Sequence, residues 1–518
     1  MQPTATNEST RTPPSRSRFA RSTLWLTLFL ILAAAALARF AHLVRKPFWF
    51  DECFSVEIAR IDWGNFLHLL WWREANMSLY YVLLRIWLHF GQSEFFIRSL
   101  SVVLALATLP AIYWVARLLY DRKVALGATA LLAINAYHIR YSQEARSYTL
   151  FALLATLSSG FLIAWLRQPT RRNWRGYVLT SSLAVYAHFY ALLLLAAHII
   201  ALLWTGLPRA RADQNEHEHR RHIRRAWIVI GIAVLPVLVF VAKTGAGPIR
   251  WIQRPGLLEL LRFASDFSNG LPIIYFAACL AALIPLKRKP LAHDGGWEAF
   301  RVHFLMICFL FPILLTILLS FARPVFLPRY MIFCLPALLI LSAAGLLRVP
   351  PKWLGAVLLG GTIILSARMI PYVYEHDFDT ERDASGAATN FILDHSQPGD
   401  AILFHVANAR VPYEFFRSLR AGENTASPKF SGTLGPEIVY PHHAAGLDYH
   451  DFTGKPTAEF VRSVAPQHQR IWLMLMNNGT AEKPDPTTVM LNEVLPEYFP
   501  KMQRWQLARV EVRLYSRE

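Results

Sequence analysis

The chain has 518 residues, of which 54% are hydrophobic and only 17% are charged. Soluble proteins carry charge on roughly a quarter of their residues, so this composition excludes an ordinary soluble enzyme and predicts a membrane protein. The net charge of +18 would suit a nucleic-acid binder only if it covered one face of a soluble domain. The basic residues instead form short runs between apolar segments, as in membrane-protein loops, and we therefore expect no nucleic-acid partner.

Residues 1–22 are rich in Ser, Thr, Pro and Arg, which predicts a disordered basic tail in the cytoplasm. The apolar run at 24–43 is long enough to cross a membrane. It lacks a small-residue cleavage site, so we expect a retained anchor helix and not a removed signal peptide.

Hydropathy and length predict about eleven membrane spans in all. After the anchor they lie near 95–118, 124–138, 147–166, 174–187, 189–206, 226–243, 270–286, 300–321, 329–347 and 353–371. The basic clusters fall in alternate connections, at 117–123, 167–175, 209–225, 287–289 and 348–352. The positive-inside rule then keeps the N-terminus in the cytoplasm and places the first loop, 44–94, and the C-terminal part outside.

The first outer loop contains two amphipathic stretches, 54–72 and 79–90, which predict helices lying along the membrane surface. The less favoured alternative is that they are short surface helices without a function of their own. From 372 to 518 the composition becomes polar, with expected strands at 401–406 and 471–476 and a helix at 385–395. This region predicts a mixed α/β domain folded outside the membrane.

Two adjacent carboxylates, Asp51 and Glu52, follow the first span among aromatic residues. Desolvation at the membrane boundary raises the pKa of a carboxyl group and makes its ionised form a better base, so a held aspartate suits proton removal from a hydroxyl group. The alternative is structural. Asp51 can cap the helix that follows, with Glu52 in its first turn.

Four arginines, Arg39, Arg98, Arg146 and Arg329, all fall at expected outer ends of apolar spans. An arginine there is costly unless it snorkels to water, pairs with a carboxylate or meets an anionic ligand. Because basic residues are disfavoured on this side, several together favour a shared anion such as a lipid phosphate. His188, in an aromatic setting, is either a contact for phosphate or acceptor or a structural histidine.

Several motifs, taken together and in this order, resemble the bacterial family 39 glycosyltransferases, relatives of the protein mannosyltransferases and aminoarabinose transferases. They are Trp-Phe-Asp-Glu at 49–52, Leu-Tyr-Tyr at 79–81 through Glu94 and Arg98, Tyr-Ser-Gln-Glu-Ala-Arg at 141–146, Tyr-Ala-His-Phe-Tyr at 186–190, Trp-Ile at 251–252 and Pro-Arg-Tyr at 328–330. The resemblance implies a GT-C fold in a bacterial inner membrane. It also implies a polyprenyl-phosphate sugar donor and an aspartate of the first outer loop as catalytic base.

Position by position, the resemblance makes Asp51 the catalytic aspartate, Glu52 its acidic neighbour and Arg98 a group for the donor phosphate. Further groups near the lipid phosphate are Arg39, Arg146, Arg329 and Tyr330. The chain departs from the mannosyltransferases at 76–79, where Asn-Met-Ser-Leu replaces a His-Pro-Pro-like stretch. The acceptor therefore stays open among glycan, lipid and protein.

A divalent cation is a further possibility, since Asp51, Glu52 and Glu144 offer oxygen ligands. Two rival functions compete with the transferase. A transporter or flippase of lipid-linked sugars would need the same arginines but predicts paired half-helices and an internal repeat, which the sequence does not display. A non-catalytic membrane subunit would serve only to present the outer domain to a partner.

Overall fold

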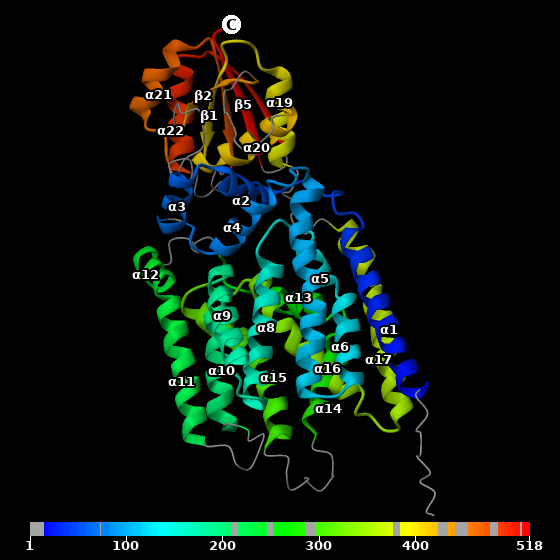
Figure 1. Cartoon of the computed structure of the whole chain (residues 1–518). Helices are drawn as coiled ribbons and strands as arrows, with labels where there is room; N and C mark the ends of the chain where they lie inside the picture. The colour runs from blue at the N-terminus through cyan, green and yellow to red at the C-terminus, as the bar shows by residue number, and fades with distance from the viewer. Residues whose placement is uncertain are drawn as a thin grey trace, which may run out of the picture.

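The computed structural model describes residues 15–72, 74–206, 208, 216–245, 252–284, 296–376, 384–422, 434–441, 454–476, 485–507 and 510–518. Most of the expected tail, 1–14, and the expected basic cluster at 287–289 lie outside these residues. The structure is a bundle of long helices with an α/β sheet at one end (Figure 1). Short helices of the first outer loop lie between the bundle and the sheet (Figure 1).

Within the described residues, six helical segments are long and apolar enough to cross a membrane. They are built from α1 (Ser15–Phe40), α5 (Glu94–Leu119), α8 (Tyr148–Arg167), α15 (Trp297–Ala322), η2 with α16 (Pro328–Cys334, Leu335–Leu346) and α17 with α18 (Lys352–Ala367, Met369–Glu375). Two bent pairs raise the possible number to eight. The expected multi-pass helical class is thus confirmed.

The two bent pairs are α11 (Glu216–Ala233) with α12 (Leu235–Thr244), at 52°, and α13 (Leu257–Phe267) with α14 (Pro272–Leu283), at 71°. Each second helix has a proline at its start, Pro236 or Pro272. Proline has no N–H for the preceding turn and its ring clashes with it, so the helix breaks there.

Fewer helices meet the length requirement than the eleven expected spans, because three of the expected spans are short helices. These are α6 (Arg122–Ala133), α9 (Arg171–Ala187) and α10 (Ala191–Thr205), with 12, 17 and 15 residues. At about 1.5 Å per residue, even the longest reaches only about 26 Å, less than the roughly 30 Å of a bilayer core. The seven-residue α7 (Ala136–Ser142) follows α6.

The first outer loop forms three helices that cover one end of the bundle (Figure 1). They are α2 (Phe50–Arg60), α3 (Trp63–Trp72) and α4 (Ser78–Trp87), in agreement with the helices expected for this loop. The first expected stretch is divided at Asp62, whose carboxylate accepts the N–H groups of Gly64 and Asn65 at 2.9 and 3.1 Å. Asp62 therefore starts a new helix at this point.

The C-terminal part holds a five-stranded sheet in the order β2-β1-β3-β5-β4. Strand β1 (Ala401–His405) pairs in parallel with β2 (Glu437–Tyr440) and β3 (Arg470–Leu475), whereas β5 (Val510–Ser516) is antiparallel to β3 and to β4 (Lys501–Leu507). Its helices are α19 (Ala384–His395), α20 (Arg410–Ala421), α21 (Ala458–Val464) and α22 (Pro486–Val494), with short turns at Ala407–Ala409, Ala465–Gln467 and Leu495–Glu497. The expected strands and helix are confirmed as β1, β3 and α19.

Helix α20 of the C-terminal part packs on α2 of the first outer loop (Figure 1). The ring of Phe415 stacks on Phe48 with 5.0 Å between centroids, and the Arg60 guanidinium lies 5.5 Å from the same ring. Buried ion pairs flank this contact, at 2.8 Å between Arg60 and Glu57 and at 2.8 Å between Arg417 and Glu414. The sheet is therefore anchored to the helix that begins with the acid pair.

Candidate active site

Asp51 is the second residue of α2, and its carboxylate lies between two arginines from distant parts of the chain. Its Oδ2 atom is 3.6 Å from Arg146 Nη2 and 3.5 Å from Arg329 Nη2. Arg146 comes from the turn before α8 and Arg329 from η2. The Asp51 side chain keeps 22% of its surface exposed, so it is in an ion-pair cluster that a ligand can still reach.

Arg146 is also held by neutral oxygens. Its Nη1 atom donates to the backbone carbonyl of Asp51 at 3.2 Å and to the hydroxyl of Ser55 at 3.1 Å. The Arg329 guanidinium lies 5.5 Å from the Trp49 ring and 5.8 Å from the Tyr330 ring. Both cations are therefore oriented by the protein before any ligand binds.

Glu52 has a different environment, although it is the next residue. It is fully buried, and its Oε atoms accept two hydrogen bonds from Arg98, at 2.8 and 2.6 Å. They also accept the backbone N–H groups of Ala145 at 2.8 Å and Trp49 at 3.4 Å. The structural alternative placed Asp51 at the N-cap and Glu52 in the first turn of the helix. In the structure Trp49 takes the N-cap position, and Glu52 closes the first turn of α2.

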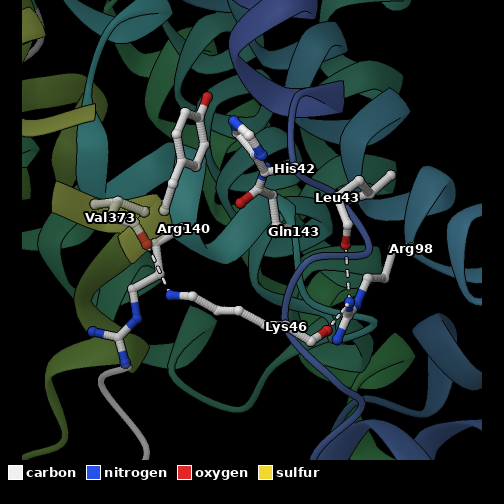
Figure 2. Close-up of a pocket in the computed structure, with 8 residues that line it drawn as sticks. His42, Leu43, Lys46, Arg98, Arg140, Gln143 and Val373 are labelled. Atoms are coloured by element: carbon white, nitrogen blue, oxygen red, sulfur yellow. Dashed lines mark hydrogen bonds between the residues drawn. The ribbon is translucent and has the colours of Figure 1, made fainter. Parts of the chain in front are cut away.

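Arg98 was expected to bind the donor phosphate, but its donors are already used within the protein. Besides Glu52, it donates to the backbone carbonyls of Leu43, Lys46 and Pro47 at 2.9, 2.7 and 3.1 Å. Figure 2 shows the Arg98 guanidinium facing the carbonyls of Leu43 and Lys46. It also shows the Lys46 side chain reaching the carbonyl of Val373. A guanidinium has five N–H groups, and all five are matched here, so the geometry favours a structural role for Arg98.

Arg39 also lies away from the Asp51 cluster. It is fully buried and donates to the carbonyls of Ala35, Leu132 and Ala133 and to the ring of His138. These partners belong to α1, to α6 and to α7. Arg39 therefore joins three helices, and carbonyl acceptors offset part of the cost of its burial.

His188 and Tyr330 complete the wall beside the two arginines. The His188 ring lies 4.4 Å from the Tyr330 ring and 5.1 Å from Phe151. Burial, with the charges of Arg146 and Arg329, lowers the pKa of His188 to about 3, so the ring is neutral. Its Nδ1 accepts the N–H of Tyr190 at 3.2 Å, which leaves the hydrogen on Nε2. That buried Nε2 atom has no hydrogen-bond partner among the described residues.

Glu74, just after α3, was not singled out from the sequence. Burial raises the pKa of Glu74 to about 7, Arg146 opposes the rise, and Asp51 adds to it. A single glutamate between a Trp-rich helix and a turn carries no sequence signal for this position. Only the folding of the loop brings it near Asp51.

The cation considered for Asp51, Glu52 and Glu144 finds no set of ligands in the described part of the chain. No group of three or more His, Cys, Asp or Glu side chains there is placed to hold a metal ion. The Glu52 oxygens are occupied by Arg98 and two backbone N–H groups. These residues thus do not fit a metal centre as they stand.

No protein-family model matches the chain, and no curated protein sequence matches it. Solved structures do match. ArnT from Cupriavidus metallidurans in the apo state aligns over 96% of this chain and 99% of its own, with 15% identity and a TM-score of 0.55. The same protein bound to undecaprenyl phosphate aligns over 95% and 98%, with 14% identity and a TM-score of 0.50. The chain therefore has the GT-C fold of ArnT.

Proposed function

We propose that this protein is a membrane glycosyltransferase that moves a sugar from a polyprenyl-phosphate donor to an acceptor hydroxyl group. The observation that carries the proposal is the cluster of Asp51 with Arg146 and Arg329, a reachable carboxylate between two preorganised cations. The fold supports it, since ArnT shares the fold and has been crystallised with undecaprenyl phosphate.

The two arginines are the proposed binding groups for the donor phosphate. A phosphate has the charge and geometry to bind two guanidinium groups, so it competes with the Asp51 carboxylate for both. Its binding would release Asp51 from the ion pairs. The free Nε2–H of neutral His188 is a further donor beside them, and Tyr330 lines the same wall.

Asp51 is the proposed general base of a single inverting displacement. Its carboxylate takes the proton of the acceptor hydroxyl group, and the acceptor oxygen forms a bond to the anomeric carbon of the sugar. The bond from that carbon to the phosphate oxygen breaks, and the polyprenyl phosphate leaves with the electron pair. Fixed cations near the leaving oxygen stabilise its growing charge, which contributes several kcal/mol in comparable sites.

Glu52 and Arg98 act in this proposal as positioning residues. Their buried pair fastens the first turn of α2 to α5 and to the backbone just before the helix. Asp51 follows directly from this fastened segment. Its carboxylate is therefore held in place with little loss of freedom when substrates bind.

The family resemblance supports a location in the inner membrane, and the positive-inside rule supports an orientation with residues 1–22 in the cytoplasm. In the same proposal, 23–371 form the GT-C membrane domain, and 372–518 form an extracytoplasmic α/β domain beside the first outer loop. The transferred group is a hexose or a pentose. Glycan, lipid and protein hydroxyl groups are all possible acceptors.

The test compares the native chain with Asp51→Asn in lipid nanodiscs, using radiolabelled polyprenyl-phosphate sugars. Loss of a general base lowers turnover by about a hundredfold to ten-thousandfold, so we expect that loss with donor binding retained. Asp62→Asn is the matched control, since Asp62 is an exposed aspartate of the same loop. Full transfer by Asp51→Asn would remove Asp51 from the chemistry.

Translocation of lipid-linked sugars is the second candidate function, favoured by the two bent helix pairs. Broken helices are common where transporters bind their substrates. The same preparations distinguish the candidates. Movement of a labelled lipid across vesicles, without turnover of any donor and unaffected by Asp51→Asn, would identify a flippase. A pathway product that survives Asp51→Asn but is lost without 372–518 would instead identify a non-catalytic subunit.

A further inference from the structure

A large cavity lies at the other end of the bundle from Asp51, where α8 ends and where α9 and α11 begin. Its volume is about 780 Å³. In Figure 1 this end of α11 is the one farthest from α2 and the sheet. The lining residues that matter here are three arginines and two tryptophans, Arg171, Arg175, Arg225, Trp165 and Trp174.

The charge of this cavity is positive. Among the described lining residues, three arginines face a single carboxylate, that of Glu218, which lies 3.6 Å from His222. Guanidinium groups on neighbouring helices are well suited to phosphate oxygens. None of the residues around the Asp51 cluster lines this cavity, so it is a separate site.

The walls are held together across two helices. The indole N–H of Trp174, on α9, donates to the backbone carbonyl of His222, on α11, at 3.2 Å. The Trp165 ring, from the end of α8, packs on His219 of α11 with 5.0 Å between centroids. The cavity is thus a feature of the packed helices and not a gap between loose side chains.

The lining changes from polar to apolar along α11. Glu218, His222 and Arg225 recur at helical spacing, and Ile228 and Val229 continue the same lining one turn farther into the bundle. Ile228 is 54% exposed and Val229 is 40% exposed. An amphiphile with an anionic head and apolar chains matches this order, with its head among the arginines and its chains along the apolar turn.

We propose that this cavity binds the headgroup of an anionic phospholipid. Basic pockets between membrane helices on the cytoplasmic side suit such lipids, and the positive-inside rule places this end of the bundle in the cytoplasmic leaflet. A free phosphate shares the headgroup chemistry but not the apolar chains. The lipid site is independent of the sugar transfer proposed above.

The experiment is native mass spectrometry of the delipidated full chain with phosphatidylglycerol, with phosphatidylcholine, or with inorganic phosphate. We expect one phosphatidylglycerol to bind at least about tenfold more tightly than phosphatidylcholine. The variant Arg171→Gln/Arg175→Gln/Arg225→Gln should weaken that binding by about a hundredfold, since each cation near an anionic headgroup contributes about tenfold or less.

The matched control is Arg172→Gln/Arg221→Gln/Arg224→Gln, which removes the same charge from the same two helices at positions that do not line the cavity. It should bind phosphatidylglycerol as the native chain does. Equal loss in the two variants, or equal binding of phosphatidylcholine by the native chain, would overturn the proposal. Competition by inorganic phosphate at the lipid's own concentration would assign the cavity to the free anion. If the first variant fails to fold, the comparison of the two lipids on the native chain decides alone.

Discussion

Neighbouring residues of the acid pair have opposite environments. Asp51 keeps 22% of its side chain exposed between two arginines, whereas Glu52 is fully enclosed by Arg98 and two backbone N–H groups. A helix turns by about 100° per residue, so consecutive side chains face different directions. This rotation points Asp51 toward the accessible arginine cluster and Glu52 toward the buried contacts that hold the helix in place.

Glu52→Gln should lower the stability of the protein, because it leaves the Arg98 cation buried without a carboxylate. Breaking such a pair costs about 3–5 kcal/mol, and thermal unfolding in detergent measures the loss. The double variant Glu52→Gln/Arg98→Met removes the unpaired charge and should recover much of the stability. If Glu52→Gln instead has the same unfolding temperature as the native chain but transfers no sugar, Glu52 takes part in the chemistry.

Glu74 predicts a pH-dependent stability. Its pKa is raised from 4.5 to about 7, so the folded state favours the neutral acid. The resulting stability is fully present below pH 4.5 and is lost as the pH rises through 7. Glu74→Gln stays neutral, and should therefore match the native chain near pH 4.5 but exceed it by on the order of 2 kcal/mol at pH 8.

Unfolding temperatures at the two pH values measure this difference. Glu459→Gln, at an exposed position of α21, is the control and should show no such pH dependence. A constant offset between Glu74→Gln and the native chain at all pH values would mean that folding does not change the pKa of Glu74.

Hydrogen bonds between separate elements hold the parts of the candidate site together. The start of α4 is tied to the turn that carries His188, since Asn76 accepts the N–H of Phe189 at 3.0 Å. Ser78 adds a bond to the carbonyl of Tyr186 at 3.3 Å. The segment that departs from the mannosyltransferase pattern is therefore the one that joins the outer loop to the bundle.

Within the bundle, α14 and α16 approach closely at Gly345. A Cβ atom there would lie 1.8 Å from the backbone oxygen of Ala278, so only glycine fits. Gly345→Leu should force the helices apart and abolish folded protein, as gel filtration in detergent would show. Gly361→Ala, with nothing within 4 Å of its added carbon, should be tolerated. Normal folding of Gly345→Leu would mean that the two helices are free to separate.

On the scale of the whole molecule, direct side-chain contacts connect the C-terminal part to the candidate active site. Phe415 of α20 stacks on Phe48, and the Phe48 ring lies 4.5 Å from the Arg98 guanidinium that holds Glu52. A chain of direct contacts thus leads from the sheet to the first turn of α2.

Phe415→Ala should destabilise this junction by about 3–5 kcal/mol, the usual cost of truncating a buried phenylalanine. We also expect slower sugar transfer with little change in donor binding, because the arginines remain while α2 loses its support. Leu419→Ala, at a position of α20 that is 46% exposed, is the control. Unchanged turnover in a folded Phe415→Ala protein would show that the C-terminal part does not support the site.

The sequence by itself determined the helical membrane class, the helices of the first outer loop and the strands β1 and β3. These follow from composition, hydropathy and local periodicity, which act over short stretches of chain. It also drew attention to the polar residues at the outer ends of the spans. The number of full-length spans was harder to predict, because a short helix such as α10 is as apolar as the spanning ones.

Only the tertiary structure decided what each of those polar residues contacts. Arg98, Arg146 and Arg329 look alike in sequence, yet Arg98 meets a buried carboxylate and carbonyl groups, while the other two meet Asp51. Glu74 came near Asp51 without any local signal. An ionic group's partner is set by distances between segments far apart in the chain, and burial then determines how strongly the two interact.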